Sequence, residues 1–128
     1  MDKITGELFI EKLFELLPET MEDFKLEERY LIDDYGKILQ TVVIEDIFMK
    51  RIFELLKENK EAERLKTIFD YFEEVCRYGE KALISQVFAI AVLENIASYQ
   101  EFVPIAKSYM GDETLKFYER NFCVEFKK

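Results

Sequence analysis

The chain has 128 residues, of which 27 are acidic and 18 are basic, so its formal net charge is −9, and it contains no histidine. Without histidine, neither the common serine or cysteine triads nor an imidazole metal ligand can form. We therefore expect a protein that is not an enzyme and needs no cofactor or metal ion. Nucleic acid is an unfavourable ligand for an acidic surface, because phosphate contacts depend on Lys and Arg.

Size and hydropathy indicate one soluble globular domain spanning residues 1–128. Hydrophobic residues make up 49% of the chain and charged residues 35%, which supplies both a core and a solvated surface. The longest apolar stretch, residues 82–93, is shorter than the roughly 20 residues of a membrane span. Residues 1–7 lack the apolar core of a signal peptide, so we expect a cytoplasmic protein that does not associate with membranes.

Helices are predicted along the first half of the chain, which has few glycines and prolines. The first covers residues 8–17, with Thr5 as its cap and Pro18 limiting its end. A second, more polar helix follows and should stop near Gly36, which can adopt the left-handed conformation of a helix end. A third helix spans residues 43–56, and Asn59 is placed to end it.

The second half begins with a helix over residues 65–76 that ends at Gly79. Its short connection to the preceding helix predicts that the two are antiparallel neighbours. The next helix, near residues 80–97, is apolar almost all round, which predicts burial at the centre of the fold. The sequence thus favours an all-α, single-domain bundle of about six or seven helices, with loosely stacked antiparallel helix pairs around this buried helix.

Residues that commonly begin or end helices recur after residue 97. Ser98 and Glu101 fit a capping box, and Pro104 predicts a kink or a new helix start. Gly111 should end one helix and Asp112 should cap the next. Residues 123–128 alternate between apolar and charged side chains, which is typical of a short extended tail.

Two groups of reactive side chains are better explained by structure than by chemistry. Cys76 and Cys123 are expected to stay reduced, with Cys76 acting as a small apolar residue of the core. Three carboxylates share a helix face, and nearby Lys66 and Arg77 favour ordinary ion pairs on a solvated surface. Those carboxylates belong to Asp70, Glu73 and Glu74.

The negative charge is concentrated between residues 15 and 34, where eight acidic residues face two basic ones. A basic protein is the natural partner of such a segment, because complementary charge speeds association and sets specificity. Neighbouring tyrosines supply the aromatic anchors that binding surfaces use. The predicted partner-binding residues are Glu15, Glu19, Glu22, Asp23, Glu27, Glu28, Tyr30, Asp33, Asp34 and Tyr35. One alternative is a solvated acidic face that keeps the protein soluble. Another is that Tyr30, Tyr35 and the apolar pair Leu31 and Ile32 are parts of the core.

Three segments carry a resemblance to known proteins: residues 68–79 (IFDYFEEVCRYG), 91–96 (AVLENI) and 106–111 (AKSYMG), together with the turn at residues 16–18. This pattern resembles a family of small uncharacterised bacterial all-helical proteins. Some members look like immunity proteins encoded beside polymorphic or contact-dependent toxins. Residues 95–99 depart from the pattern, because a more acidic segment is expected there. The resemblance implies no catalytic residue.

Composition and resemblance together favour an immunity protein that binds a basic toxin domain and blocks it by occlusion, with a nuclease as the favoured toxin activity. The carboxylates would occupy the place of substrate phosphates or cover an adjacent surface. The first alternative is a helical scaffold or adaptor that acts by self-assembly or protein binding. The second is an enzyme or ligand carrier with a carboxylate-only site, which requires Asp and Glu side chains that converge in a closed pocket.

Overall fold

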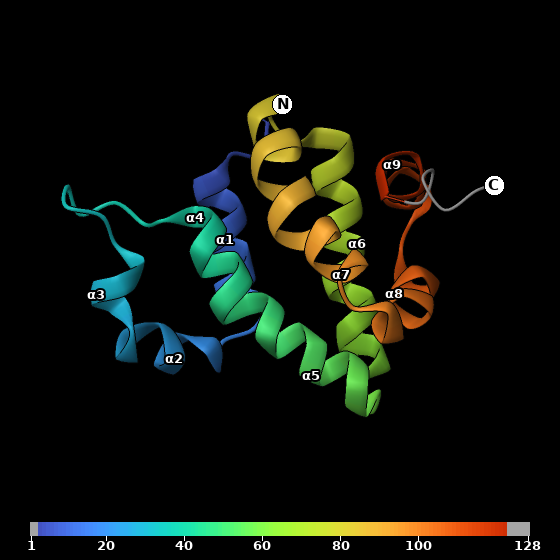
Figure 1. Ribbon diagram of the computed structural model, residues 1–128, viewed down its shortest axis with the longest axis horizontal. Helices are drawn as coiled ribbons and strands as arrows, with labels where there is room; N and C mark the ends of the chain where they lie inside the picture. The colour runs from blue at the N-terminus through green and yellow to red at the C-terminus, as the bar shows by residue number, and fades with distance from the viewer. Residues whose placement is uncertain (1–2, 123–128) are drawn as a thin grey trace.

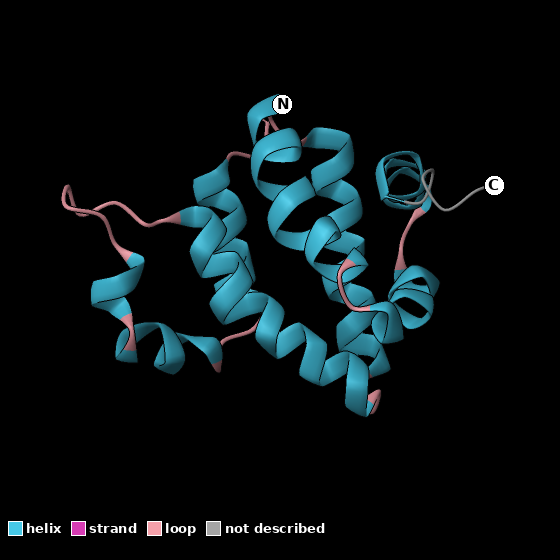
Figure 2. Ribbon diagram, in the orientation of Figure 1, coloured by secondary structure: helices cyan, strands magenta, loops and turns pink. Residues whose placement is uncertain are grey.

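Helices account for most of residues 3–122, the part of the chain that the computed structural model describes (Figures 1 and 2). Within those residues β-pairing is limited to two isolated bridges, Ile4 with Gly79 and Ile32 with Ile38. The all-α prediction is therefore confirmed. None of the helices between residues 3 and 122 combines the length and the apolar character that crossing a membrane requires.

The first helix, α1 (Gly6–Leu16), begins and ends where the sequence predicts. The Thr5 hydroxyl accepts a hydrogen bond from the Leu8 backbone N–H at 3.1 Å, which satisfies one free donor of the first turn. The helix ends just before Pro18. Its apolar face buries Phe9, Ile10 and Leu13.

The predicted second helix is broken into two short ones, α2 (Thr20–Leu26) and α3 (Glu28–Leu31), with Glu27 in a non-helical conformation between them. A long loop then leads to the next helix (Figure 2). Gly36 has a φ of 82°, so its left-handed conformation is confirmed. It lies in a turn of that loop, however, and not at a helix end, because the helix has already stopped at Leu31.

The third predicted helix is one continuous run formed by α4 (Gln40–Val43), η1 (Ile44–Met49) and α5 (Lys50–Glu58), whose middle part has the wider π geometry. Asn59 ends it in the left-handed conformation, with a φ of 49°, as predicted. The chain then enters α6 (Ala62–Tyr78), which runs back past α5 towards the opposite end of the molecule (Figure 1).

A second π segment, η2 (Leu83–Glu94), continues into α7 (Asn95–Ala97) and forms the helix predicted to be buried all round. It does contribute strongly to the core. One strip of it nevertheless faces solvent, and Ile90 is 43% exposed there. The exposed positions of the strip are Ala82, Ser85, Gln86, Ile90 and Glu94. The helix is therefore covered on most sides but not enclosed.

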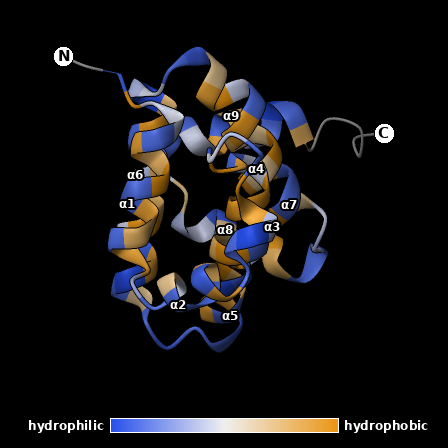
Figure 3. Ribbon diagram, turned by 90° about the vertical axis from the view of Figure 1, so that its left-hand side faces the viewer, coloured by the Kyte–Doolittle hydropathy of each residue, from blue (hydrophilic) through white to orange (hydrophobic). Residues whose placement is uncertain are grey.

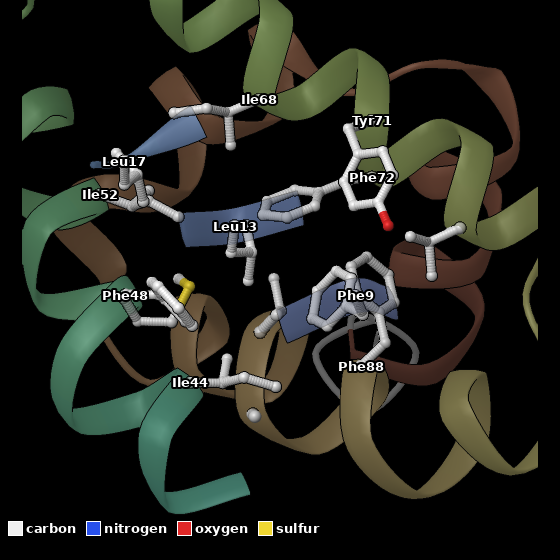
Figure 4. Close-up of a cluster of buried hydrophobic side chains, with 14 of the residues drawn as sticks. Phe9, Leu13, Leu17, Ile44, Phe48, Ile52, Ile68, Tyr71, Phe72 and Phe88 are labelled. Carbon is white, nitrogen blue, oxygen red and sulfur yellow. The ribbon is translucent and has the colours of Figure 1, made fainter. Parts of the chain in front are cut away.

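The core lies where α1, α6 and η2 meet, and three phenylalanines mark its centre (Figure 4). Phe9 lies edge-on to Phe88 with ring centroids 6.0 Å apart, and Phe72 lies 5.4 Å from Phe88. All three side chains are fully buried. Apolar and hydrophilic residues alternate around the helices in Figure 3, as expected for amphipathic helices that pack on one side.

The C-terminal part of the described chain contains η3 (Gln100–Phe102), α8 (Val103–Tyr109) and α9 (Asp112–Phe122). Pro104 lies in the first turn of α8, which confirms the predicted new start. The capping box at Ser98 is wrong, because the Ser98 hydroxyl donates to the Glu94 carbonyl and so closes the preceding helix. The predicted tail and Cys123 lie outside the described residues.

The start of α9 is capped from another helix and not by Asp112, which is its first helical residue. The Glu73 carboxylate on α6 accepts hydrogen bonds from the backbone N–H groups of Glu113 at 2.9 Å and Thr114 at 3.0 Å. The Thr114 hydroxyl donates to it as well, at 2.9 Å. One carboxylate therefore attaches α9 to α6, and the prediction that Asp112 performs this role is wrong.

Candidate protein-binding surface

The segment that carries most of the predicted site residues forms an arm, here called the acidic arm (residues 19–37). It comprises α2, α3 and the following turn, and Figure 1 shows it at the far left, away from α6, α8 and α9. Large apolar or aromatic side chains are exposed along it. Leu26 is 83% exposed, Tyr30 is 64% exposed and Tyr35 is 89% exposed.

The acidic arm is attached to the body by a few buried side chains. Phe24 is 8% exposed and packs edge-on against Phe14 of α1, with ring centroids 5.4 Å apart. Leu31 is buried at the end of α3. Thr20 is fully buried, and its hydroxyl donates to the Leu17 carbonyl at 2.6 Å. The remaining side chains of α2 and α3 are exposed.

Glu19 is predicted to contact a partner, but the structure gives it an internal role. Its carboxylate accepts hydrogen bonds from Arg51 of α5, at 2.8 Å, and from Arg64 of α6. Burial alone would raise the pKa of Glu19, but the hydrogen bonds from Arg64 and Arg51 outweigh it and lower the pKa to about 2. The charge of Glu19 is thus largely neutralised within the fold.

Two further acids of the predicted binding surface, Asp33 and Glu15, also have other positions or contacts than predicted. Asp33 holds the turn at the tip of the arm, where its Oδ1 accepts hydrogen bonds from the backbone N–H groups of Tyr35 at 2.8 Å and Lys37 at 2.9 Å. Glu15 belongs to α1, where its side chain is 70% exposed and lies 3.8 Å from Lys12. Asp33 therefore stabilises the turn, and Glu15 lies outside the arm.

The other predicted residues are exposed on the acidic arm. Five carboxylates remain at the surface, on Glu22, Asp23, Glu27, Glu28 and Asp34. The Arg29 guanidinium lies 4.8 Å from the centroid of the Tyr30 ring and donates to the Tyr30 hydroxyl at 2.8 Å. Both predicted tyrosines are exposed, so the alternative that they belong to the core is wrong for them, whereas Leu31 is 2% exposed and does belong to the core. Exposed aromatic side chains among carboxylates are the combination that binding surfaces use.

A groove that the sequence does not predict lies beside the arm. It consists of three adjoining hollows. Asp46 lines all three, while Lys50, Glu45 and Tyr99 each line two of them. The groove runs from α2 across η1 and α5 to η2 and η3. Its acidic lining residues are Asp23, Glu27, Glu45, Asp46, Glu54, Glu94 and Glu101, and its basic ones are Lys50 and Arg51.

The groove escapes sequence reasoning because its residues come from segments far apart in the chain. Glu45 and Asp46 look like ordinary polar positions of a helix, and Glu94 and Glu101 are isolated acids among uncharged residues. Only the packing of α2 and η2 against η1 brings these side chains to one face.

A separate hollow of about 730 Å³ lies between α1 and residues 36–40, with Ile10 and Phe14 on its apolar side. Glu7, Glu11 and Glu80 line it together with Lys37, and its mouth is wide. Glu7 and Glu11 lie one turn apart on α1, whereas Lys37 and Glu80 come from other segments of the chain.

The reactive side chains elsewhere in the described chain have structural roles. Burial raises the pKa of the Cys76 thiol, so that side chain stays protonated at neutral pH, as expected of a core residue. Lys66 lies 2.8 Å from Asp70 and Arg77 lies 3.0 Å from Glu73, which confirms the predicted ion pairs. Glu73 is only 15% exposed and also caps α9, so the description of it as simply solvated is wrong.

Metal binding finds no support in the geometry of residues 3–122. In that part of the chain, no group of three or more His, Cys, Asp or Glu side chains is arranged to hold a metal ion. The carboxylates of the groove are spread along its length and do not converge on one point.

Residues 10–124 match the sequence pattern of a family described as a domain of unknown function, DUF7674. The chain belongs to this family. No curated protein and no solved structure matches it. The DUF7674 match covers the acidic arm, the groove and α9, so these features belong to the family's own domain and not to an appended segment.

Proposed function

We propose that this DUF7674 protein is an immunity protein that binds a basic toxin domain in the cytoplasm and neutralises it by occlusion. The supporting observation is the acidic arm, where Leu26, Tyr30 and Tyr35 are exposed among surface carboxylates. Exposed aromatic and apolar side chains are the anchors that protein-binding surfaces use. Their acidic surroundings select a partner that carries positive charge.

The geometry supports occlusion as the mode of inhibition. Toxin domains that act on nucleic acids carry Lys and Arg where substrate phosphates bind. Carboxylates on the arm and in the groove present the same negative charge as a phosphate backbone, on a protein that those groups cannot process. The loosely stacked helix pairs around residues 80–97 would serve as a rigid support behind this surface, so no catalytic residue is needed.

Self-assembly, the alternative function, is less favoured by the same observations. Two copies that meet through the acidic arm would bring like charges together, and each copy carries a net charge of −9. Repulsion of this kind costs several kcal/mol at an interface unless opposite charges intervene. A basic partner removes that cost.

We predict that a gene for a basic domain lies beside the chain's own gene, and the test is a growth assay in which that domain is expressed with and without the chain. We expect growth to be restored by the wild type. A quadruple variant, Glu22→Lys with Asp23→Lys, Glu27→Lys and Glu28→Lys, should fail to restore growth. The reversed charges repel the basic partner, and complex formation in a pull-down of the same two proteins should drop at least about tenfold.

A matched control changes four exposed acids outside the arm, on α5, α6 and α9. These are Glu58, Glu63, Glu74 and Glu119, each replaced by lysine. The control has the same net charge as the arm variant but should protect cells as the wild type does. Circular dichroism verifies that both variants fold, and glutamine versions replace any lysine variant that does not. Protection by the arm variant equal to that of the control would overturn the role of the arm.

A further inference from the structure

Three aromatic side chains line one hollow of the groove: Phe53 of α5, Phe102 of η3, and Tyr99, which lies between α7 and η3. Phe53 and Phe102 are stacked with ring centroids 4.9 Å apart. Tyr99 lies edge-on to Phe53 at 5.1 Å and at 6.4 Å from Phe102. The two phenylalanines are half-buried, whereas Tyr99 is 47% exposed. The three rings form a fixed aromatic wall, here called the aromatic trio, with its tyrosine at the surface.

Carboxylates surround the aromatic trio on several sides. Glu27 of the acidic arm, Glu45 and Asp46 of η1, and Glu101 of η3 line the same hollow, which has a volume of about 530 Å³. Lys50 is the basic side chain that lines it. The hollow is thus apolar on one wall, aromatic at its exposed edge and strongly negative around its rim.

The face of an aromatic ring is electron-rich and attracts a cation, and the attraction increases where carboxylates lie nearby. A guanidinium is planar, stacks on aromatic faces and donates paired hydrogen bonds to carboxylates. An ammonium is a more strongly hydrated point charge and gains less from a flat aromatic wall. An uncharged apolar side chain could contact the rings but would leave the carboxylates unpaired.

We propose that the hollow lined by the aromatic trio receives an arginine side chain of the basic partner. The guanidinium would stack on Tyr99 while it donates to the carboxylates of the rim. The proposal rests on the proposed function for the identity of the partner, but the pocket itself can be tested without one. A second copy of the chain is a poor occupant, because the hollow is acidic and the chain is too.

The probe is N-acetyl-arginine amide, titrated into the ¹⁵N-labelled protein and followed by NMR. We expect saturable shifts of the Tyr99, Glu101 and Glu45 backbone signals at millimolar concentration, the affinity that a single side chain can supply. N-acetyl-citrulline amide has nearly the same shape but no charge, and it should shift these signals far less. N-acetyl-lysine amide should bind more weakly than the arginine probe.

Variants separate the contribution of the ring from that of the carboxylate. Tyr99→Leu should weaken arginine binding about two- to fivefold, whereas Tyr99→Phe, which keeps the aromatic face, should bind within about twofold of the wild type. Tyr99→Leu combined with Glu101→Gln should weaken it about tenfold. Tyr78→Leu is the matched control, because Tyr78 is 46% exposed but lies at the far end of α6.

Three results would overturn the pocket: no saturable shift in the wild type, equal shifts with the citrulline probe, or unchanged affinity in Tyr99→Leu. The growth assay separates this failure from failure of the proposed function. If the chain protects cells while the arginine probe does not bind, only the pocket is lost. If the probe binds while the chain neither protects cells nor binds the neighbouring basic domain, the pocket stands and the immunity function falls.

Discussion

Glu19 is the residue whose structural role differs most from its sequence prediction. It follows α1, and its carboxylate joins that segment to Arg51 of α5 and Arg64 of α6. The same two arginines also contact Glu54 and Glu61, so the site is a small network and not a single pair. Networks of this kind contribute more than isolated surface pairs, which are worth about 0 to 1 kcal/mol.

We predict that Glu19→Gln lowers the free energy of unfolding by about 1 kcal/mol at pH 7, a modest figure because the site is partly exposed and screened by solvent. The pKa of Glu19 is lowered from 4.5 to about 2 in the folded protein. Its contribution is therefore complete above about pH 5 and is lost as the pH falls towards 2. Urea denaturation at a series of pH values measures this.

The control for this prediction is Glu22→Gln on the same arm, which should change the free energy of unfolding by less than about 0.5 kcal/mol. The difference in free energy of unfolding between the wild type and Glu19→Gln should decrease steadily from pH 5 to pH 2. A gap that stays constant across that range would show that the carboxylate charge is not what stabilises the fold.

At the scale of elements, the attachment of α9 depends on an acceptor that belongs to α6. Glu73 lies on α6, and its carboxylate accepts hydrogen bonds from backbone N–H groups in the first turn of α9. Burial acts to raise the pKa of Glu73, but the N–H groups of Thr114 and Glu113 lower it overall, so the acceptor remains charged at neutral pH. Gly111 allows this approach, because a Cβ there would lie 2.5 Å from a Glu73 carboxylate oxygen.

We predict that Glu73→Ala destabilises the protein by about 1 to 3 kcal/mol, because the N–H donors at the start of α9 lose their acceptor. The effect should be local. Hydrogen exchange of the α9 amides should accelerate more than that of η2, which belongs to the core. Gly111→Ala should weaken α9 in the same way, because the added methyl group displaces the carboxylate.

Asp70→Ala on the same helix is the matched control, since it removes an ion pair with Lys66 but leaves α9 untouched. Asp70→Ala should lower the free energy of unfolding by about 0.5 kcal/mol and leave the hydrogen exchange of the α9 amides unchanged. Equal exchange rates in Glu73→Ala and Asp70→Ala would contradict the role of Glu73 as the attachment of α9.

Element boundaries were predictable where one residue determines the local backbone. Thr5 supplies a hydroxyl to a free N–H, Asn59 tolerates a left-handed conformation, and Pro104 fits a first helical turn. The break at Glu27 was not predictable, because neither Gly nor Pro stands there. The cap of α9 was missed for a related reason: the acceptor lies on α6, about forty residues away along the chain, and local patterns report only near neighbours.

At the scale of the whole molecule, exposed apolar groups and net charge have opposite effects on self-association. Leu26 and Tyr35 favour association, whereas a charge of −9 keeps copies apart. The acidic part of the candidate surface was predictable, because contiguous residues carry it. The groove was not, because its carboxylates come from several helices that only the fold brings together.

We predict that the protein is a monomer at pH 7 and self-associates as the pH approaches 4.7, the isoelectric point of the sequence. Near that pH the repulsion vanishes and the exposed side chains of the arm can pair. Sedimentation velocity between pH 7.5 and 5 measures the change. The double variant Leu26→Ser with Tyr35→Ser should associate much less than the wild type.

Tyr78→Ser serves as the comparison, because it removes an exposed tyrosine that lies outside the arm. It should self-associate as the wild type does. Equal self-association of the double variant and Tyr78→Ser would show that the protein associates through another surface and not through the arm.

The narrow attachment of the acidic arm also has a consequence for how such a protein can change over generations. Phe24, Leu31 and Thr20 connect the arm to the core, and most of its other side chains face solvent. Substitutions at those exposed positions should be nearly neutral for stability. The surface of the arm can therefore diversify while the helices behind it are inherited intact, so that new surface chemistries arise without passing through unfolded ancestors.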